Sequence, residues 1–223
     1  MQILDTAYSK TQQKGVSQKK IWSENVWATS YTHPLDMDIC HTYFTKESLI
    51  LDMGCGNGRV VDKLRQSGYT KAVGYDTRPS RMENGKTDHR LPVYYSTKTE
   101  DISCEDESAD GILLFAVLTC IPSNKGQSDL IKFLYSKLKT GGILYVSDYY
   151  LQKDALRMGI YEYLENNRDN FGIFRSPEGP MRHHTREWIR RLFKDYNKLS
   201  EIPLHLPTNR GDHASAFQLV LQK

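Results

Sequence analysis

The amino-acid sequence predicts an α/β fold organised around a doubly wound, mostly parallel β-sheet. An aliphatic run at residues 48–51 leads into three alternating glycines, and an amphipathic helical pattern follows at once. Residues 109–118 are nearly all apolar, as expected of a central strand that is buried on both faces. Strand and helix patterns alternate through residue 150, and this order is typical of parallel sheets covered by helices.

The bulk composition indicates an ordinary globular chain. With 223 residues, 39% hydrophobic and 26% charged, the sequence suits one domain with a sizeable core, or one domain with an appendage. The net charge of +3 is too small to indicate a nucleic-acid partner. Four widely spaced cysteines predict neither a zinc site nor a disulfide framework.

No apolar run reaches the roughly 18 residues that a membrane-spanning helix needs. The N-terminus also lacks the apolar segment of a signal peptide. We therefore expect a soluble cytoplasmic protein without a metal or a membrane partner. The sequence leaves its oligomeric state open.

The glycine-rich turn predicts a site for a nucleotide-like ligand. Gly54, Gly56 and Gly58 permit positive φ angles and a close approach of a ligand to the backbone. The following helix offers free amide groups at its N-terminus. A dinucleotide fingerprint requires G-x-G-x-x-G, whereas Arg59 stands here at the third glycine position. A purely structural glycine turn is the alternative.

A short strand pattern after this helix ends in Asp76, 18 residues beyond Gly58. A carboxylate at this place accepts both ribose hydroxyls of a bound nucleoside, and a turn-capping aspartate is the alternative. Gly141-Gly142 is expected to end a helix, and Thr185 to cap another. The patterns predict helices at residues 127–139 and 185–193 and strands at residues 91–96, 109–118, 143–150, 196–204 and 214–221.

Two regions interrupt the alternation of strands and helices. Residues 1–46 are predicted to form an N-terminal arm and a helical cap, in which Trp27 and Tyr31 share a helix face. Aromatic and arginine side chains alternate irregularly in residues 151–184. An insertion of this length in a compact domain usually has a function. We expect a substrate lid there, inserted in a domain that spans residues 47–223.

Together these motifs resemble those of the class I S-adenosylmethionine (SAM)-dependent methyltransferases, of the type that acts on small molecules. The resemblance rests on D-x-G-x-G-x-G at residues 52–58, on the apolar strand at 109–118, and on L-K-x-G-G-x-L-x-V-S-D at 138–148. It spans residues 48–150 clearly and 184–223 weakly. It implies a Rossmann-like seven-stranded sheet, mostly parallel with the last strand antiparallel, and SAM as the cofactor.

The resemblance also implies which residues bind SAM. Asp101 and Ile102 would meet the adenine, with Glu100 as the alternative acid, and residues 115–118 would pass the methionine part. Arg59 would reach the SAM carboxylate. The complete set is Asp52, Gly54, Gly56, Gly58, Arg59, Asp76, Thr77, Asp101, Ile102, Phe115, Ala116 and Leu118.

Methyl transfer requires alignment of the acceptor, and it requires a base only where the acceptor must lose a proton. Many relatives carry a histidine after the fourth strand, but Thr119 and Cys120 stand there in this sequence. The predicted catalytic candidates are His183, His184 and Tyr149, with Tyr150 and His213 as further options. Adjacent histidines at a helix start are more often exposed caps. The pair could instead bind an acidic substrate with Arg182 and Arg186.

The expected activity is therefore methyl transfer from SAM to a small-molecule acceptor by in-line displacement. No [N/D]-P-P-[Y/F] motif follows the fourth strand, and no Pro-Cys pair is present, so methylation of base amino groups or of cytosine C5 is unsupported. The alternatives are a peptide or RNA methyltransferase, and a SAM-binding protein without catalysis, because no base is evident.

Overall fold

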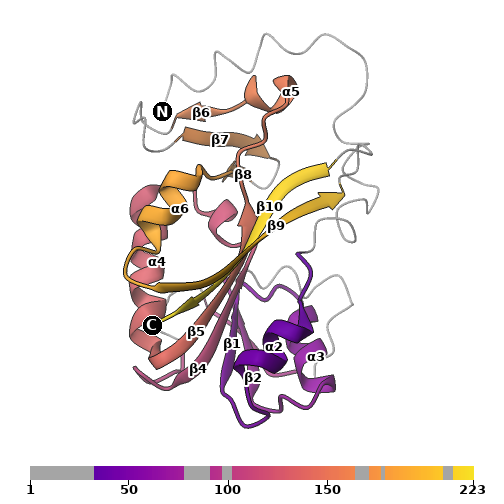
Figure 1. Ribbon diagram of the computed structural model, residues 1–223, viewed down its shortest axis with the longest axis vertical. Coiled ribbons are helices and arrows are strands. Elements are labelled where there is room, and N and C mark those ends of the chain that lie inside the picture. Colours follow the sequence, from indigo (N-terminus) through magenta and orange to yellow (C-terminus); the bar gives the residue numbers. More distant parts are fainter. Residues whose placement is uncertain (1–32, 78–90, 97–101, 164–170, 177–178, 208–212) are drawn as a thin grey trace.

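The computed structural model describes residues 33–77, 91–96, 102–163, 171–176, 179–207 and 213–223, and its centre is a seven-stranded sheet. The strand order is β3-β2-β1-β4-β5-β10-β9 (Figure 1). The strands are β1 (Ile50–Met53), β2 (Ala72–Asp76), β3 (Val93–Tyr95), β4 (Ala109–Phe115), β5 (Leu138–Tyr149), β9 (Asn197–Pro207) and β10 (His213–Gln222). The sheet is parallel from β3 to β5, whereas β10 is antiparallel to both β5 and β9. The predicted Rossmann-like sheet with an antiparallel last strand is confirmed.

Helices cover both faces of this sheet, as Figure 1 shows. Helices α2 (Met37–Tyr43) and α3 (Arg59–Gln66) cover one face, and α4 (Asn124–Lys137) and α6 (Arg186–Leu192) cover the other. On β5, Tyr145 belongs to the core cluster on the α2–α3 face, and Val146 to the cluster on the α4–α6 face. Because side chains alternate along a strand, Ser147 and Tyr149 lie on the α2–α3 face, and Asp148 lies on the α4–α6 face.

The insertion at residues 151–184 contains regular structure that its composition did not reveal. Helix α5 (Ala155–Met158) precedes an antiparallel sheet of β6 (Glu162–Tyr163), β7 (Phe171–Ser176) and β8 (Gly179–Arg182). A bridge between Tyr150 and His184 ties this segment to the end of β5. In Figure 1 the small sheet lies above the carboxyl ends of the parallel strands. Open α/β sheets bind their ligands at this edge.

Several element bounds differ from the predicted ones. The fourth strand ends at Phe115 and not at residue 118, because Ala116 has φ 54° and the chain turns into the 3-10 helix η4 (Leu118–Cys120). The prediction that Gly141-Gly142 ends a helix is wrong. Helix α4 ends at Lys137, and the two glycines lie inside β5, where Gly141 has φ 80° and the register opposite β4 shifts.

The remaining predictions differ by a few residues. The first strand begins two residues later than predicted, at Ile50, and β5 begins five residues earlier, at Leu138. The predicted cap at Thr185 is confirmed, because its hydroxyl accepts the Trp188 N–H at 3.0 Å. The predicted positions of Trp27 and Tyr31 lie outside the described residues. No helix within the described ranges is long and apolar enough to cross a membrane.

Candidate active site

The glycine-rich loop between β1 and α3 has the backbone conformation that its sequence predicts. Gly54, Gly56 and Gly58 have φ angles of 76°, 58° and 84°, which side chains with a Cβ rarely adopt. A Cβ on Gly54 would stand 2.4 Å from Val117 Cγ2, so the loop also packs closely against the chain that leaves β4. The N–H of Gly54 donates to the Tyr75 carbonyl at 2.7 Å and ties the loop to β2.

Asp76 lies at the end of β2, directly beside this loop. Its Oδ2 accepts the N–H of Gly56 at 2.8 Å, and the side chain is nine-tenths buried. The Tyr95 hydroxyl, at the end of β3, donates to the Gly56 carbonyl at 2.9 Å. Thr77 follows Asp76 and is exposed. The structure thus brings the predicted loop and carboxylate together and adds Tyr95, which no sequence motif singled out.

Asp52 and Arg59 flank the other side of the loop. Asp52 is 2% exposed, and its Oδ2 has no hydrogen-bond partner among the described residues. Burial raises the pKa of Asp52 to about 7, the Arg59 charge opposes this rise, and the Asp76 charge adds to it. Arg59 begins α3, and its Nη2 donates to the His33 carbonyl at 2.9 Å. A buried carboxylate oxygen without a partner fits a cationic ligand group, such as the ammonium of SAM.

The chain leaving β4 forms the middle of the site. Phe115 packs its ring against Tyr145 at 4.9 Å between centroids. The N–H of Ala116 donates to the Ser147 carbonyl at 2.8 Å, which holds the turn against β5. Leu118 is fully buried. The three residues predicted to line the methionine part of SAM therefore lie at the carboxyl end of β4, next to the glycine loop.

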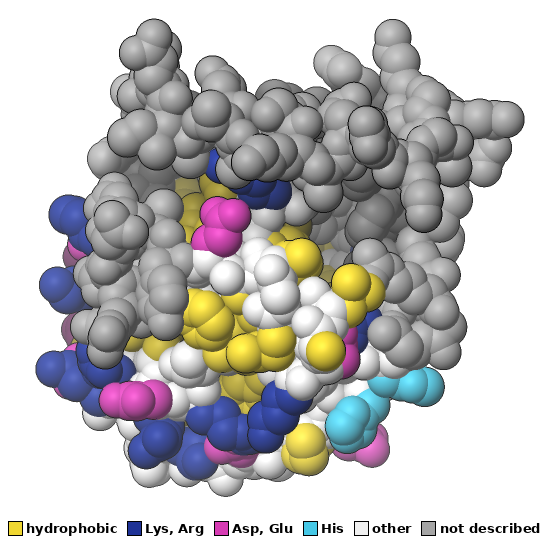
Figure 2. All heavy atoms as spheres, turned by 90° about the horizontal axis from the view of Figure 1, so that it is seen from above, with side chains coloured by type: hydrophobic (Ala, Val, Ile, Leu, Met, Phe, Trp, Pro, Cys, Tyr) yellow, Lys and Arg dark blue, Asp and Glu magenta, His cyan; other side chains and the backbone are white. Residues whose placement is uncertain are grey.

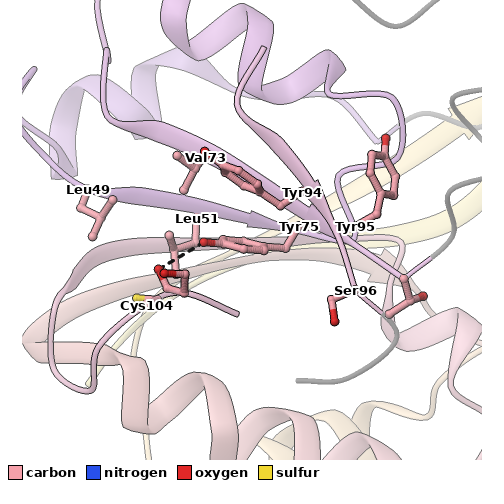
Figure 3. A pocket seen from close by; sticks show the side chains of 10 residues that line it. Leu49, Leu51, Val73, Tyr75, Tyr94, Tyr95, Ser96 and Cys104 are labelled. Carbon is pink, nitrogen blue, oxygen red and sulfur yellow. Dashed lines mark hydrogen bonds between the residues drawn. The ribbon is translucent and has the colours of Figure 1, made fainter. Parts of the chain in front are cut away.

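A cavity of about 740 Å³ opens beside the ends of β2 and β3 (Figure 3). Its lining residues are Leu49, Leu51, Val73, Tyr75, Thr77, Tyr94, Tyr95, Ser96, Ser103 and Cys104. Ile102 follows the third strand and packs partly buried against the core. The other predicted adenine contacts, Asp101 and Glu100, lie outside the described residues. The flat apolar walls of this cavity adjoin Asp76 through Thr77.

His183 and Tyr149 meet in an aromatic cluster under the small sheet. The ring centroid of His183 lies 5.2 Å from Tyr149, 4.6 Å from Phe174 and 5.7 Å from Tyr161. The Tyr161 hydroxyl is 2.7 Å from His183 Nδ1 and accepts the N–H of Gln152 at 3.0 Å. Burial, with the charges of Arg157 and His33, lowers the pKa of His183 to about 3. This histidine is therefore neutral near pH 7.

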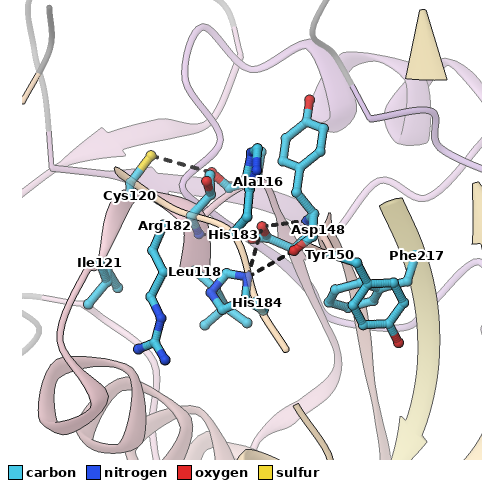
Figure 4. A network of polar contacts seen from close by, with 12 residues as sticks. Ala116, Leu118, Cys120, Ile121, Asp148, Tyr150, Arg182, His183, His184 and Phe217 are labelled. Atoms are coloured by element: carbon cyan, nitrogen blue, oxygen red, sulfur yellow. Dashed lines mark hydrogen bonds and ion pairs between the residues drawn. The ribbon is translucent and has the colours of Figure 1, made fainter. Parts of the chain in front are cut away.

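His184 lies on the α4–α6 face of the seven-stranded sheet and is fully buried beside Asp148 (Figure 4). Its Nδ1 lies 3.1 Å from the Tyr149 carbonyl and its Nε2 lies 2.9 Å from Gln127 Nε2. The Trp188 indole donates to Gln127 Oε1 at 2.6 Å. Burial lowers the pKa of His184 to about 3. The expectation of an exposed cap is wrong, because β8 carries His184 into the core, where both ring nitrogens are in hydrogen bonds and support the fold.

Asp148 supports the turn that follows β4. Its Oδ2 accepts the N–H of Thr119 at 3.1 Å, and the carboxyl is fully buried. Burial raises the pKa of Asp148 to about 7, and hydrogen bonds from backbone N–H groups, including that of Thr119, oppose the rise. Thr119, which stands where relatives carry a histidine, therefore serves here as the backbone partner of a buried acid.

The other predicted candidates lie away from the aromatic cluster. The Tyr150 hydroxyl donates to Glu201 at 2.9 Å, and Arg186 pairs with the same carboxylate at 2.8 Å. Arg182 is fully buried and donates to Asn124 Oδ1 at 2.6 Å, so it joins β8 to α4. His213 is exposed and lines a cavity of about 620 Å³ together with Tyr150, His184 and Arg186. Of the predicted acidic-substrate set, His184 and Arg186 line this cavity, whereas His183 lies in the aromatic cluster and Arg182 bonds to α4.

Seen from above the carboxyl ends of the strands, the described surface is mainly apolar and uncharged near its middle, with lysine and arginine side chains gathered along one edge (Figure 2). No group of three or more His, Cys, Asp or Glu side chains that could hold a metal ion occurs in the part of the chain that the structure describes. The site therefore consists of a backbone cradle, two carboxylates and neutral aromatic groups.

A match to a known protein family identifies the class of this chain. The family model described as "Methyltransferase domain" matches residues 32–197. Because this model covers most of the chain, the chain belongs to the methyltransferase family and is an enzyme. The predicted family and enzyme class are confirmed.

Solved structures show the same fold. A SAM-dependent methyltransferase from Methanosarcina mazei is 24% identical with a TM-score of 0.70, and the match covers 83% of this chain and 96% of that one. A SAM-dependent methyltransferase from Archaeoglobus fulgidus is 13% identical with a TM-score of 0.61, covering 84% and 91%. The 1,6-didemethyltoxoflavin-N1-methyltransferase of Burkholderia thailandensis, which holds its substrate and S-adenosylhomocysteine, is 14% identical with a TM-score of 0.58, covering 83% and 75%. No curated protein matches the sequence.

Proposed function

We propose that this protein transfers the methyl group of SAM to a small-molecule acceptor by in-line displacement. The observation that carries the proposal is the neutral aromatic cluster of Tyr149, Tyr161, Phe174 and His183 beneath the small sheet. Tyr149 of this cluster lies two residues beyond Ser147, whose carbonyl accepts the Ala116 N–H, and the neighbouring Val117 packs against the glycine loop. Neutral rings of this kind, two of them partly exposed, suit a small flat molecule.

The cofactor side of the proposal assigns each end of SAM to residues of this chain. Asp76 would accept the ribose hydroxyls, and the unpartnered Oδ2 of Asp52 would accept from the ammonium group. Arg59, Phe115, Ala116 and Leu118 would flank the methionine part. Ile102, with Asp101, would meet the adenine. SAM supplies the activated methyl group, and the chain's own residues hold and align the two reactants.

The insertion at residues 151–184 would act as the lid that closes over the acceptor. Its β7 and β8 strands supply Phe174 and lead directly to His183. The division into a cap at residues 1–46 and a domain at 47–223 stays a prediction, and so does a cytoplasmic location. The methyltransferase of Burkholderia thailandensis, whose substrate is 1,6-didemethyltoxoflavin, offers an example of a small acceptor on this fold.

Calorimetric titration with SAM and S-adenosylhomocysteine tests the cofactor assignment. Release of S-adenosylhomocysteine in the presence of a panel of small metabolites, of peptides and of RNA then tests the acceptor class. We expect turnover with a small molecule only. Turnover with peptide or RNA alone would contradict the proposal, and tight SAM binding without turnover on any panel would favour a SAM-binding protein.

A further inference from the structure

His33, which precedes α2, is a buried histidine whose two ring nitrogens have different surroundings. Its Nδ1 lies 2.6 Å from Ser147 Oγ, and the same Oγ lies 3.1 Å from the Phe217 carbonyl. A carbonyl can only accept, and a serine has one hydroxyl proton, so Ser147 donates to Phe217. Ser147 must then accept from His33 Nδ1–H. This network assigns the Nδ1–H tautomer to His33 and leaves the lone pair on Nε2.

The Nε2 atom is buried and has no hydrogen-bond partner among the described residues, although His33 is only 1% exposed. A buried acceptor without a partner is costly, and such groups occur where a ligand completes the site. Because the two nitrogens lie on different edges of the imidazole, Nε2 faces away from Ser147 and the strand beneath it. A bound molecule that displaces what covers this atom would meet a hydrogen-bond acceptor.

The two neighbouring histidines do not offer such a lone pair. In His184, Nδ1–H donates to the Tyr149 carbonyl and Nε2 accepts from the Gln127 amide. In His183, Nδ1 accepts from the Tyr161 hydroxyl, whose proton has no other acceptor within the described ranges. His183 therefore carries its proton on Nε2 and can donate from it, whereas His33 can accept.

His33 also lies between the helix that follows the glycine-rich loop and the end of β5. Its carbonyl accepts from Arg59 Nη2 at 2.9 Å, at the first residue of α3. Its side chain reaches Ser147, which pairs with Phe115 across β4 and β5. Its ring meets Tyr149 edge-on at 4.6 Å between centroids. His33 thus contacts both the predicted SAM site and the aromatic cluster.

We propose that His33 is the catalytic base, and that the acceptor is a flat ring bearing an O–H or N–H group. This inference rests on the proposed function and narrows its acceptor class. The acceptor's oxygen or nitrogen forms a bond to the methyl carbon, and the carbon–sulfur bond breaks with its electron pair left on sulfur. The acceptor's proton passes to His33 Nε2 and then to solvent. Burial and the Arg59 charge lower the pKa of His33 to about 3, so the imidazolium can form only as the positive charge of the sulfonium is lost in the same step.

The charges in the site balance during this step. A positive sulfonium and a neutral imidazole become a neutral thioether and a positive imidazolium, so the net charge of the buried site does not change. An acceptor without a transferable proton would leave the charge on the product and would make no use of Nε2. The Tyr149 ring contacts both His33 and His183, and these rings provide the flat surface that an aromatic acceptor prefers.

The tautomer can be measured without any turnover. Nitrogen-15 NMR of histidine-labelled protein, assigned by comparison with His33→Gln, should show Nδ1 protonated and Nε2 unprotonated for His33 at pH 7. Ser147→Ala should abolish this preference. A protonated Nε2 in the wild-type protein would overturn the inference, whether or not the protein proves to be a methyltransferase.

Turnover tests the base directly, with SAM affinity measured in parallel. The probes are catechol, 4-nitrophenol and benzimidazole, which carry a transferable proton, and pyridine and dimethyl sulfide, which are nucleophiles without one. We expect methylation of the first group, at least a hundredfold loss of kcat in His33→Gly, an unchanged SAM affinity, and partial rescue by added imidazole. His41→Ala, on the exposed side of α2, serves as the matched control and should behave as the wild type.

Each other outcome has a defined meaning. A loss of SAM affinity in His33→Gly that accounts for the whole loss of turnover would overturn the base and indicate a cofactor contact. Preferred methylation of pyridine or dimethyl sulfide would overturn the acceptor class. Absence of SAM binding in the wild type would defeat the proposed function itself. If SAM binds and no probe is methylated, the measured tautomer decides. An unprotonated Nε2 would support His33 as the base, and a protonated Nε2 would overturn it.

Discussion

The carboxylate of Asp76 accepts the backbone N–H of Gly56 at 2.8 Å, and this hydrogen bond joins the end of β2 to the glycine-rich loop. We propose that the same carboxylate accepts the ribose hydroxyls of SAM. In that case one side chain would both hold the loop and bind the cofactor. This double role can be separated by substitution.

Asp76→Ala should weaken SAM binding by about 1–3 kcal/mol, the scale of a lost charged hydrogen-bond partner. Asp76→Asn keeps an acceptor for Gly56 and should retain the loop but lose part of the ribose affinity. Asp38→Ala, on the exposed side of α2, is the control and should bind as the wild type. Titration calorimetry measures all three variants, and equal affinity of Asp76→Ala and the wild type would refute the ribose assignment.

A second prediction concerns the close packing of the loop. Gly54→Ala and Gly141→Ala introduce a Cβ at nearly equal φ angles, 76° and 80°. Both should lose about 1–2 kcal/mol of unfolding free energy from the left-handed backbone. Only the Cβ at Gly54 meets a neighbour, Val117 Cγ2 at 2.4 Å, whereas the atom nearest to that of Gly141 is 3.9 Å away.

Gly54→Ala should therefore lose more stability than Gly141→Ala, and it alone should lose SAM affinity. Urea unfolding and calorimetry give both quantities. Adding Val117→Ala to Gly54→Ala should restore part of the stability, which a double-mutant cycle quantifies. Equal losses of unfolding free energy in the two glycine variants would contradict this prediction, because they would show that Val117 can move aside without loss of stability.

The contrast between the loop and His33 shows how far the sequence predicts this site. Gly54 to Gly58 and Asp76 follow strands directly, so local patterns fix their conformation and their place at the sheet edge. His33 acquires its role from Ser147, which lies 114 positions away along the chain. No local pattern records such a contact. The sequence therefore predicted the glycine loop and the position of Asp76 beside it, and it did not predict the contacts of His33.

His184 was misplaced for the same physical reason. Its neighbours in sequence suggested an exposed helix start, and Thr185 does cap α6. Just after β8, however, an isolated bridge pairs His184 with Tyr150 at the end of β5. The His184 ring is buried against Gln127, which is 57 positions away along the chain. Short strands such as β6 and β8 are set by pairing with β7, and pairing partners are not visible in the composition of a segment.

A third prediction concerns the dependence of stability on pH. His33, His183 and His184 have pKa values of about 3 in the fold, well below the 6.5 of an exposed histidine. Between these values the unfolded chain binds protons that the folded chain does not, so each histidine favours unfolding as pH falls from 6.5. Asp52 and Asp148, with pKa values raised to about 7, favour the folded state over the same range.

Three histidines thus oppose two aspartates, and the unfolding free energy should fall as the pH is lowered from 6.5 to 4.5. The slope should be about 1.4 kcal/mol per pH unit for one net proton. His33→Gln removes one histidine and should flatten the slope, whereas Asp148→Asn removes one opposing acid and should steepen it. Urea unfolding at both pH values measures the difference, and opposite changes in the two variants would contradict the assignment.

The last prediction concerns Tyr161, whose hydroxyl joins the insertion to the aromatic cluster. It accepts the N–H of Gln152 at 3.0 Å and donates to His183 Nδ1. Tyr161→Phe leaves both buried groups without that partner, which should cost about 1–3 kcal/mol of unfolding free energy. If the aromatic cluster binds the acceptor as proposed, KM for the acceptor should rise while SAM affinity stays unchanged. Tyr94→Phe, at a ring that is 53% exposed, is the matched control and should alter neither stability nor KM. A loss of SAM affinity in Tyr161→Phe would place the hydroxyl on the cofactor side and would contradict the role of residues 151–184 as an acceptor lid.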